Sequence, residues 1–377
     1  MQTVIKNAHI FTGENEYSNG FLRFDQQVIA VGSMADYQEL ASDEQVIDAQ
    51  GQVMVPGFID VHCHGGYGID TMDADSDKLN EMVHQMTVNE GVTTIFPTTV
   101  TQSVEQFDQA VTAVAQAATQ NPVIQGIHLE GPFINAKYKG AQPAPFIKQP
   151  DPNLLRRWEQ LSNGMVKIIT YAPEMEGARD LENACLADGV IPSAGHTDAT
   201  YAQMQASKAS HVTHLYNAQR GLHHREPGVT GFAFLNDQVT GEIIADGHHV
   251  VPEMVKLAYQ VLGPKRLELV TDAMRAKGLP DGQSELGGQV VIVKDGQARL
   301  TSGNLAGSVL KFNQAFKNII AFTGCSINEA VQMASVNQAQ EFNLQQKGIL
   351  TPGRDADFNL LSSDLNLSAT YSQGKLV

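Results

Sequence analysis

The feature that most constrains the fold of this 377-residue sequence is a regular alternation of short apolar runs with helix-like segments along its middle section. Strands that alternate with helices indicate βαβ units in a parallel sheet, and eight strands are the number that closes an α/β barrel. The sequence predicts strands over residues 53–61, 93–97, 123–129, 166–171, 190–194, 211–213, 242–245 and 267–271. It predicts helices over 77–90, 103–119, 152–162, 201–207 and 252–262. The expected fold is therefore α/β, with a (β/α)8 TIM-like barrel.

Both ends of the chain differ from this middle section. Four short segments with strand-like alternation, separated by turn residues, occupy residues 3–11, 20–24, 27–31 and 45–48. The tail beyond residue 348 is similar, with apolar segments on either side of a Pro352-Gly353 turn. We therefore expect one small β-sandwich domain built from residues 1–52 plus 348–377, and a barrel domain over residues 53–347.

Composition excludes several classes of partner and site. The formal net charge of −16 argues against nucleic acid or an anionic membrane surface as the main partner. No apolar run approaches the ~20 residues needed to span a bilayer, and no secretory leader opens the sequence. Cys63, Cys185 and Cys325 are too few and too scattered for a disulfide framework. These features predict a cytoplasmic protein with reduced thiols.

Two histidines stand at the end of the first predicted barrel strand. Side chains alternate between faces along a strand, so His62 and His64 point the same way, into the barrel mouth, while Cys63 points into the wall. Barrel enzymes build their sites at these C-terminal strand ends. Such a pair can hold a metal ion, although two histidines that only form hydrogen bonds at a strand end would give the same pattern.

Three further residues with metal-binding side chains fall at other strand ends. Glu130 ends the third strand, His196 follows the fifth and His214 ends the sixth. Imidazole combined with carboxylate suits Zn²⁺ or Fe²⁺, whereas an all-oxygen set would suit Mg²⁺. We predict a divalent metal site made from these three residues together with His62 and His64. His128, deeper on the third strand, is expected to be a core histidine with satisfied hydrogen bonds.

Asp272 ends the eighth strand and is the candidate catalytic residue. A carboxylate beside a metal-activated water can take its proton and later deliver it to a leaving group. A further metal ligand or a helix cap would also place a carboxylate here.

The residues from Met54 to His64 resemble the first-strand signature of the amidohydrolase superfamily. Later segments resemble one branch, the N-acetylglucosamine-6-phosphate deacetylases, over 128–133, 195–197, 213–218, 225–228, 244–249, 270–274 and 305–308. The tail over 353–358 is similar to the closing β-segment of the superfamily. This resemblance covers nearly the whole chain, in order and at compatible spacing.

The resemblance implies a homodimer that removes acetate from N-acetylglucosamine 6-phosphate in amino-sugar catabolism, using one or two divalent metal ions, Zn²⁺ or Fe²⁺. It implies that Glu130, His196 and His214 hold the principal ion and that Asp272 is the proton shuttle. It also implies a set of substrate-binding residues: Asn217, the backbone at Ala218 and Arg225 for the phosphate, His249 for the sugar, and Leu305, Ala306 and Gly307 along the pocket. Arg225 can act in its own or in the neighbouring subunit.

The sequence departs from some members of this branch. It keeps His62 and His64, which some members replace, so a two-metal site is consistent with the chain. It carries Gln142 where some members have a histidine, and an amide can donate a hydrogen bond to substrate but cannot carry a proton. The rival functions are an amidohydrolase acting on N-acetylgalactosamine 6-phosphate or a cyclic amide, and a non-catalytic barrel, which should have lost its ligands.

Overall fold

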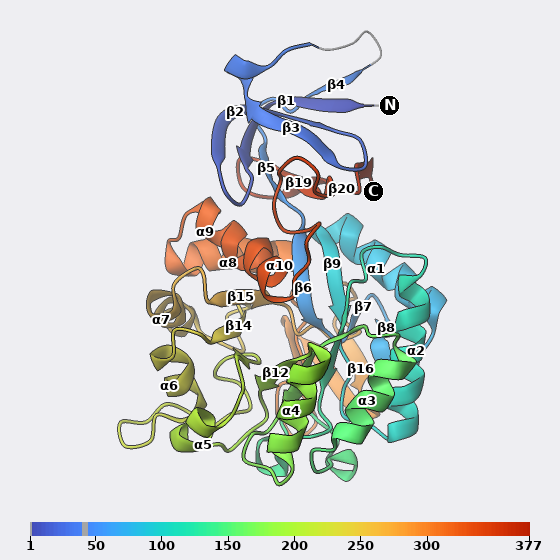
Figure 1. Cartoon of the computed structure of the whole chain (residues 1–377), viewed down its shortest axis with the longest axis vertical. Coiled ribbons are helices and arrows are strands. Elements are labelled where there is room, and N and C mark those ends of the chain that lie inside the picture. The colour runs from blue at the N-terminus through green and yellow to red at the C-terminus, as the bar shows by residue number, and fades with distance from the viewer. Residues whose placement is uncertain (1, 40–43) are drawn as a thin grey trace.

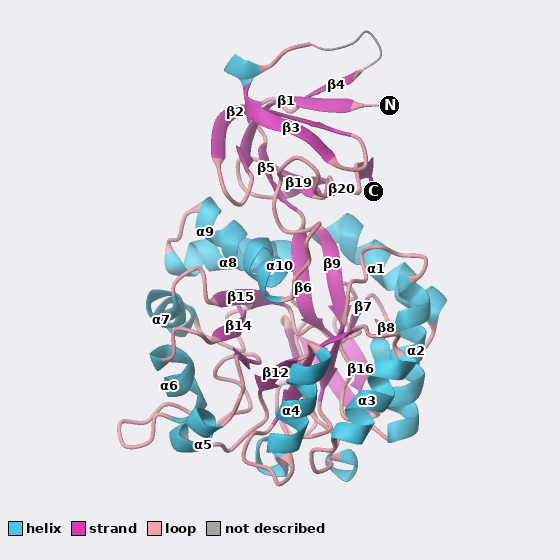
Figure 2. Cartoon of the chain, in the orientation of Figure 1, coloured by secondary structure: helices cyan, strands magenta, loops and turns pink. Residues whose placement is uncertain are grey.

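A closed ring of eight parallel strands forms the centre of the larger domain (Figures 1 and 2). The computed structural model describes residues 2–39 and 44–377. The strands are β6 (Phe58–Cys63), β9 (Val92–Pro97), β10 (Ile127–Glu130), β11 (Val166–Tyr171), β12 (Ile191–Ala194), β13 (His211–Val212), β14 (Thr240–Ile244) and β15 (Leu267–Val270). Strands β10 to β15 pair in sequence order and β6 pairs with β9. Parallel bridges from Thr98 to His128 and from Cys63 to Ala273 close the ring. The predicted TIM-like barrel is confirmed.

Helices cover the outside of this ring. They are α1 (Ser76–Glu90), α2 (Val104–Ala118), α3 (Pro152–Leu161), α4 (Ala178–Asp188), α5 (Tyr201–Ala206), α6 (Gly228–Leu235), α7 (Pro252–Leu262), α8 (Phe312–Thr323), α9 (Ile327–Val331) and α10 (Asn337–Glu341). Helix α1 shows why they form: the Asp75 side chain caps its first turn, and Gly91 ends it in a left-handed conformation. Its buried residues recur at helical spacing and face the strands, as Leu79, Met82, Val83 and Met86.

The single strand predicted over residues 53–61 is wrong, because the chain forms two strands there. Residues Val53–Pro56 form β5, which pairs with strands of the terminal sheet, and only β6 belongs to the barrel. The break falls at Gly57, where a Cβ atom would lie 2.0 Å from Oγ1 of Thr93. Only glycine lets the backbone pass this close, so the apolar run changes sheets at that residue.

Both chain ends contribute strands to one eight-stranded sheet, which also includes β5, beyond the bound of residue 52 expected for the small β-sandwich domain. Its strands pair in the order β21-β20-β19-β5-β1-β2-β3, and β4 adds to β1. Their bounds are β1 (Thr3–Phe11), β2 (Glu16–Phe24), β3 (Val28–Ser33), β4 (Gln45–Asp48), β19 (Phe358–Leu361), β20 (Leu367–Ser372) and β21 (Lys375–Leu376). Side chains from both ends share its core, including Ile5, Leu22, Met54 and Phe358. In Figure 1 this unit lies against the N-terminal ends of the barrel strands.

Two small antiparallel elements decorate the opposite, C-terminal end of the barrel. Strands β7 (Gly65–Gly66) and β8 (Ile69–Asp70) form a short hairpin after β6, and β16 (Gly282–Leu286), β17 (Gln289–Lys294) and β18 (Gln297–Leu300) form a three-stranded sheet after β15. Neither was expected from the sequence. Among the described residues, the three cysteines are buried and free, and no helix is both long and apolar enough to cross a membrane.

Candidate active site

Glu130, His196 and His214 meet at the C-terminal end of the barrel. Oε1 of Glu130 lies 3.1 Å from Nε2 of His196 and 3.0 Å from Nε2 of His214, and the two Nε2 atoms are 3.1 Å apart. Glu130 is the last residue of β10, while the two histidines follow β12 and β13. Three separate strands thus bring one carboxylate oxygen and two imidazole nitrogens to a single point.

The backbone at the strand ends turns sharply to aim these side chains. His196 has a φ of 48° and His214 a φ of 31°, and Asp272, which follows β15, has a φ of 47°. Residues other than glycine rarely adopt this left-handed conformation, and such strain clusters at functional sites. Gly195 makes room for the turn, because a Cβ there would lie 2.7 Å from the Thr170 side chain.

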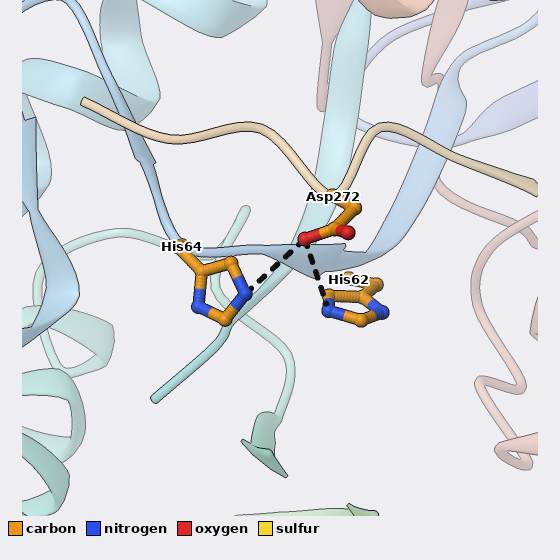
Figure 3. A group of neighbouring side chains, drawn as sticks. All are labelled: His62, His64 and Asp272. Carbon is orange, nitrogen blue, oxygen red and sulfur yellow. Dashed lines mark ion pairs between the residues drawn. The ribbon is translucent and has the colours of Figure 1, made fainter. Parts of the chain in front are cut away.

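A second group, His62, His64 and Asp272, lies beside the first. Oδ1 of Asp272 is 3.4 Å from Nε2 of His62 and 3.2 Å from Nε2 of His64, so that one carboxylate oxygen stands between the two imidazoles (Figure 3). The two groups are contiguous, because Nε2 of His64 is also 3.2 Å from Oε2 of Glu130. The structure therefore assembles all five predicted metal ligands and the predicted proton shuttle in one cluster.

Burial and mutual contact set the protonation of this cluster. Burial opposes a charge on His62, but the carboxylates of Glu242 and Asp272 outweigh it and raise the pKa of His62 to about 9. Burial alone would raise the carboxylate pKa values, yet the surrounding histidines lower the pKa of Glu130 well below its usual range and also lower that of Asp272. Both carboxyl groups are therefore ionised at neutral pH, as ligation and proton acceptance require.

The cluster fits a divalent metal ion. Its six side chains are at most 10% exposed, and burial of so many ionisable groups would be costly without a bound cation. The Nδ1 atom of His196 binds the carbonyl of Tyr138, which turns its Nε2 toward Glu130 and His214. Nε2 of His62 has no hydrogen-bond partner among the described residues, and a metal ion bound there would replace the proton that the raised pKa of His62 keeps on the ring. Donor atoms around a tetrahedral Zn²⁺ lie roughly 3.3–3.6 Å apart for bonds of about 2.0–2.2 Å, close to the spacing in the Glu130 group.

An open cavity of about 480 Å³ lies above this cluster and brings most of the predicted site residues together. Of the predicted residues its wall contains His64, Glu130, Gln142, His196, His214, Asn217, Ala218, His249, Asp272, Leu305 and Gly307. His249 is held by Asp246, whose Oδ2 lies 2.7 Å from its Nδ1, so Nε2 is left for a ligand in the cavity. The volume falls in the range of roughly 300–1,000 Å³ found for small-molecule sites, and the wall provides several hydrogen-bonding groups.

Gln142 has partners in the structure that the sequence did not suggest. Its amide nitrogen donates to Oε2 of Glu130, and its amide oxygen accepts a hydrogen bond of 2.7 Å from the backbone of Thr101. With both ends occupied, the side chain holds the Glu130 carboxylate in place.

Two of the predicted substrate residues lie outside the cavity of this chain. Arg225 is exposed on the loop before α6, where its Nη1 lies 2.7 Å from Nε2 of His224. Ala306 is wholly buried, and its backbone nitrogen donates to the carbonyl of Ala298. Ala306 thus fixes the loop whose neighbours, Leu305 and Gly307, do face the cavity.

Sequence reasoning missed several cavity residues. Arg299 and Asn304 come from β18 and the turn after it, and Lys137 and Tyr138 come from the loop after β10. The alternation in residues 289–294 was the signal for the three-stranded sheet, with buried residues at every second position. His128, in contrast, is the core histidine that was predicted, with its ring nitrogens on the Val61 carbonyl and the Thr170 hydroxyl. Burial lowers its pKa to about 3 and keeps it neutral.

Comparisons with known proteins agree with this geometry. The chain is 40% identical to the N-acetylglucosamine-6-phosphate deacetylase of Bacillus subtilis (strain 168), over 99% of this chain and 96% of that protein. It is 33% identical to the N-acetylgalactosamine-6-phosphate deacetylase of Escherichia coli O157:H7, over 100% and 99%. The crystal structure of N-acetyl-D-glucosamine-6-phosphate deacetylase from Mycobacterium smegmatis superimposes with a TM-score of 0.93 at 33% identity, over 100% of both chains. A family model described as the amidohydrolase family matches residues 53–377. The chain belongs to the amidohydrolase family.

Proposed function

We propose that this protein hydrolyses the acetamide of N-acetyl-D-glucosamine 6-phosphate, giving D-glucosamine 6-phosphate and acetate, in amino-sugar catabolism. The observation that carries the proposal is the buried cluster of four histidines and two carboxylates at the base of a polar cavity. A non-catalytic barrel has no use for such a cluster, which is costly to bury. The names of the relatives supply the substrate, and one related structure was determined in complex with N-acetyl-D-glucosamine-6-phosphate.

The metal-binding residues are Glu130, His196 and His214, with His62 and His64 as ligands of a second ion. Imidazole and carboxylate donors favour Zn²⁺ or Fe²⁺. When bound, such an ion supplies a Lewis acid for the acyl carbonyl and lowers the pKa of a water molecule. Gln142 holds Glu130 at one oxygen, which leaves the other for ligation.

Asp272 is the proton carrier in this proposal. Its pKa is lowered by His62 and His64 despite burial, so the carboxylate accepts a proton from the attacking water. It then returns that proton to the nitrogen of the departing sugar amine, which cannot leave as an anion. Its position on the wall of the cavity gives it access to both atoms in turn.

Phosphate recognition falls to groups at the rim of the cavity. Asn217 and Ala218 lie three and four residues after His214 and line the cavity, and Ala218 has a φ of 46°. Backbone N–H groups in such turns can face an anion. Arg225 lies outside the cavity of its own chain, which supports a homodimer in which it reaches the neighbouring subunit's phosphate. Its guanidinium can pair two donors with phosphate oxygens.

Acetate release tests the proposal directly. Steady-state rates would be measured with the 6-phosphates of N-acetylglucosamine and N-acetylgalactosamine, and with unphosphorylated N-acetylglucosamine. We expect the glucosamine epimer to have the highest kcat/KM, and the unphosphorylated sugar to lose most of it. Treatment with a chelator should abolish the activity, and addition of Zn²⁺ or Fe²⁺ should restore it.

A second candidate is the galactosamine epimer, which the Escherichia coli relative named above supports. A strong preference for N-acetylgalactosamine 6-phosphate would replace our substrate with that one. Activity that survives complete metal removal would refute the metal-dependent mechanism for either epimer.

A further inference from the structure

A run of buried polar side chains leads from the metal-binding cluster through the barrel to its opposite end. The interior of such barrels is ordinarily filled by branched apolar side chains. Here Glu242 on β14, Glu268 on β15 and His211 on β13 point inward, and all three are fully buried. Glu341, the last residue of α10, joins them from the side of the terminal sheet.

One oxygen of Glu242 contacts both halves of the metal-binding cluster. Oε2 lies 2.8 Å from Nδ1 of His62 and accepts a hydrogen bond of 2.9 Å from the backbone nitrogen of His214. His62 belongs to the group that contains Asp272, and His214 to the group that contains Glu130. Glu242 is therefore the shared support of two groups that come from different strands of the barrel.

The other oxygen of Glu242 faces His211. Oε1 lies 3.4 Å from Nε2 of His211, and Nδ1 of His211 lies 3.0 Å from Oε1 of Glu341. Thr240 donates its hydroxyl to the same Glu341 carboxylate. An imidazole with a carboxylate at each nitrogen is held as a cation, and it offsets the charge of both neighbours.

We propose that Glu242, which pairs with His211 and through it with Glu341, is a positioning residue that fixes the two metal-binding groups relative to one another. The inference rests on the metal site of the proposed function but not on the identity of the substrate. Metal-binding histidines commonly donate their other N–H to a carboxylate, which fixes the tautomer and the ring orientation. For His62 that carboxylate is Glu242, so Nε2 is left free to face the ion.

The same oxygen also steadies the strained backbone at His214. A φ of 31° is unfavourable for a histidine, and a hydrogen bond from its N–H to a buried carboxylate offsets part of that cost. Loss of Glu242 should therefore lower the metal affinity of both metal-binding groups together. Loss of a ligand such as His64 should weaken chiefly its own group.

Glu268 makes the far end of this network distinctive. Neither of its carboxyl oxygens has a hydrogen-bond partner among the described residues, and its ligand atom lies within 4.8 Å of those of His211 and Glu341. Burial and the nearby charge of Glu341 raise the pKa of Glu268 well above its usual range, so the group is a neutral acid at neutral pH. A metal ion bound there would be the competing way to neutralise the charge.

Metal binding measured without substrate tests this inference. Metal-free protein would be titrated with Zn²⁺ against a chromophoric chelator, for the wild type, Glu242→Ala, Glu242→Gln and His211→Gln. We expect Glu242→Ala to lower the affinity for every equivalent of Zn²⁺ about 10–100-fold, the range typical when a residue that supports a metal ligand is replaced. Glu242→Gln keeps the size and one accepting oxygen, and should lose less. Because His211→Gln removes only the partner of Glu242, it should lower affinity in the same direction while KM stays unchanged.

Glu182→Gln is the matched control, because Glu182 is an equally buried carboxylate whose hydrogen-bond partner is Tyr171, away from the cluster. It should leave zinc affinity unchanged, and thermal unfolding of the metal-free variants shows which of them fold. Three results would overturn the inference: unchanged affinity in Glu242→Ala, a loss confined to one equivalent, or an additional equivalent removed by Glu268→Gln. Zinc binding without acetate release would count against the proposed function alone.

Discussion

Replacement of Asp272 by asparagine separates proton transfer from every other role of this residue. Oδ1 of Asp272 lies 3.4 Å from Nε2 of His62 and 3.2 Å from that of His64, and asparagine can keep an oxygen at this point. The side chains have nearly the same size, so the cavity wall should keep its shape. What asparagine cannot do is accept a proton from water or return it to the sugar nitrogen.

The expected loss follows from the contribution of a positioned acid–base group. Such a group accelerates a reaction about 10²–10⁴-fold, which corresponds to roughly 3–5 kcal/mol of barrier at 1.36 kcal/mol per tenfold change. Because substrate binding rests on other residues of the cavity, kcat should fall by this factor while KM changes little. Acetate release under saturating substrate measures kcat, and elemental analysis of the same samples measures bound metal.

The two measurements together decide the role. Full acetate release by Asp272→Asn would refute the proton-carrier assignment. A loss of activity accompanied by loss of one metal equivalent would instead make Asp272 chiefly a ligand, the alternative that its place between His62 and His64 allows (Figure 3). Glu182→Gln, which removes a buried carboxylate outside the site, should retain full activity and full metal content.

Three further predictions concern stability and reactivity. Lys277→Ala should lower the free energy of unfolding by about 3–5 kcal/mol, because it leaves the buried Glu90 carboxylate without the ammonium group that lies 3.1 Å away. The double variant Lys277→Met, Glu90→Gln removes both charges and should lose much less free energy of unfolding, as measured by urea denaturation. Burial raises the pKa of the Glu159 carboxyl to about 7. The contribution of this carboxyl to the free energy of unfolding is therefore complete below the ordinary carboxyl pKa and is lost as the pH rises through 7. Glu159→Gln should raise Tm at about pH 8 and change it little at about pH 4. Burial raises the pKa of Cys63 and Cys185 to about 12, and all three cysteines are buried. Iodoacetamide should therefore label none of the three thiols in the native protein and all three after unfolding, as counted by mass spectrometry. Labelling of the native protein would contradict the burial argument.

The barrel could be predicted because its signal is repeated. Each strand and helix has its own periodicity, and eight repetitions outweigh a local error such as the strand over residues 53–61. That error arose because β5 and β6 are both buried, so one unbroken apolar run crosses from one sheet to the other. Only the contact between Gly57 and Thr93, which lie far apart in sequence, marks the change of sheet.

Within the site, the sequence predicted which side chains gather into the cluster better than it predicted the residues that support them. His62, Glu130, His196 and His214 stand at strand ends, and barrel geometry brings strand ends together. The contacts of Gln142 with Glu130 and of Glu242 with His62 depend on which side chains meet across the barrel, and no local pattern encodes that. Arg299 was missed for another reason: it sits on β18, in the three-stranded sheet that interrupts the βα repeat.

The left-handed backbone at His196, His214 and Asp272 means that selection for stability and selection for activity favour different residues at these positions. Each such residue costs about 1–2 kcal/mol that glycine or asparagine would largely avoid. A library of variants screened only for survival of heating should therefore accumulate glycine and asparagine at these three positions. The same library screened for growth on the amino sugar should keep histidine and aspartate there. If both screens give these results, the barrel mouth keeps its chemistry at a cost in stability.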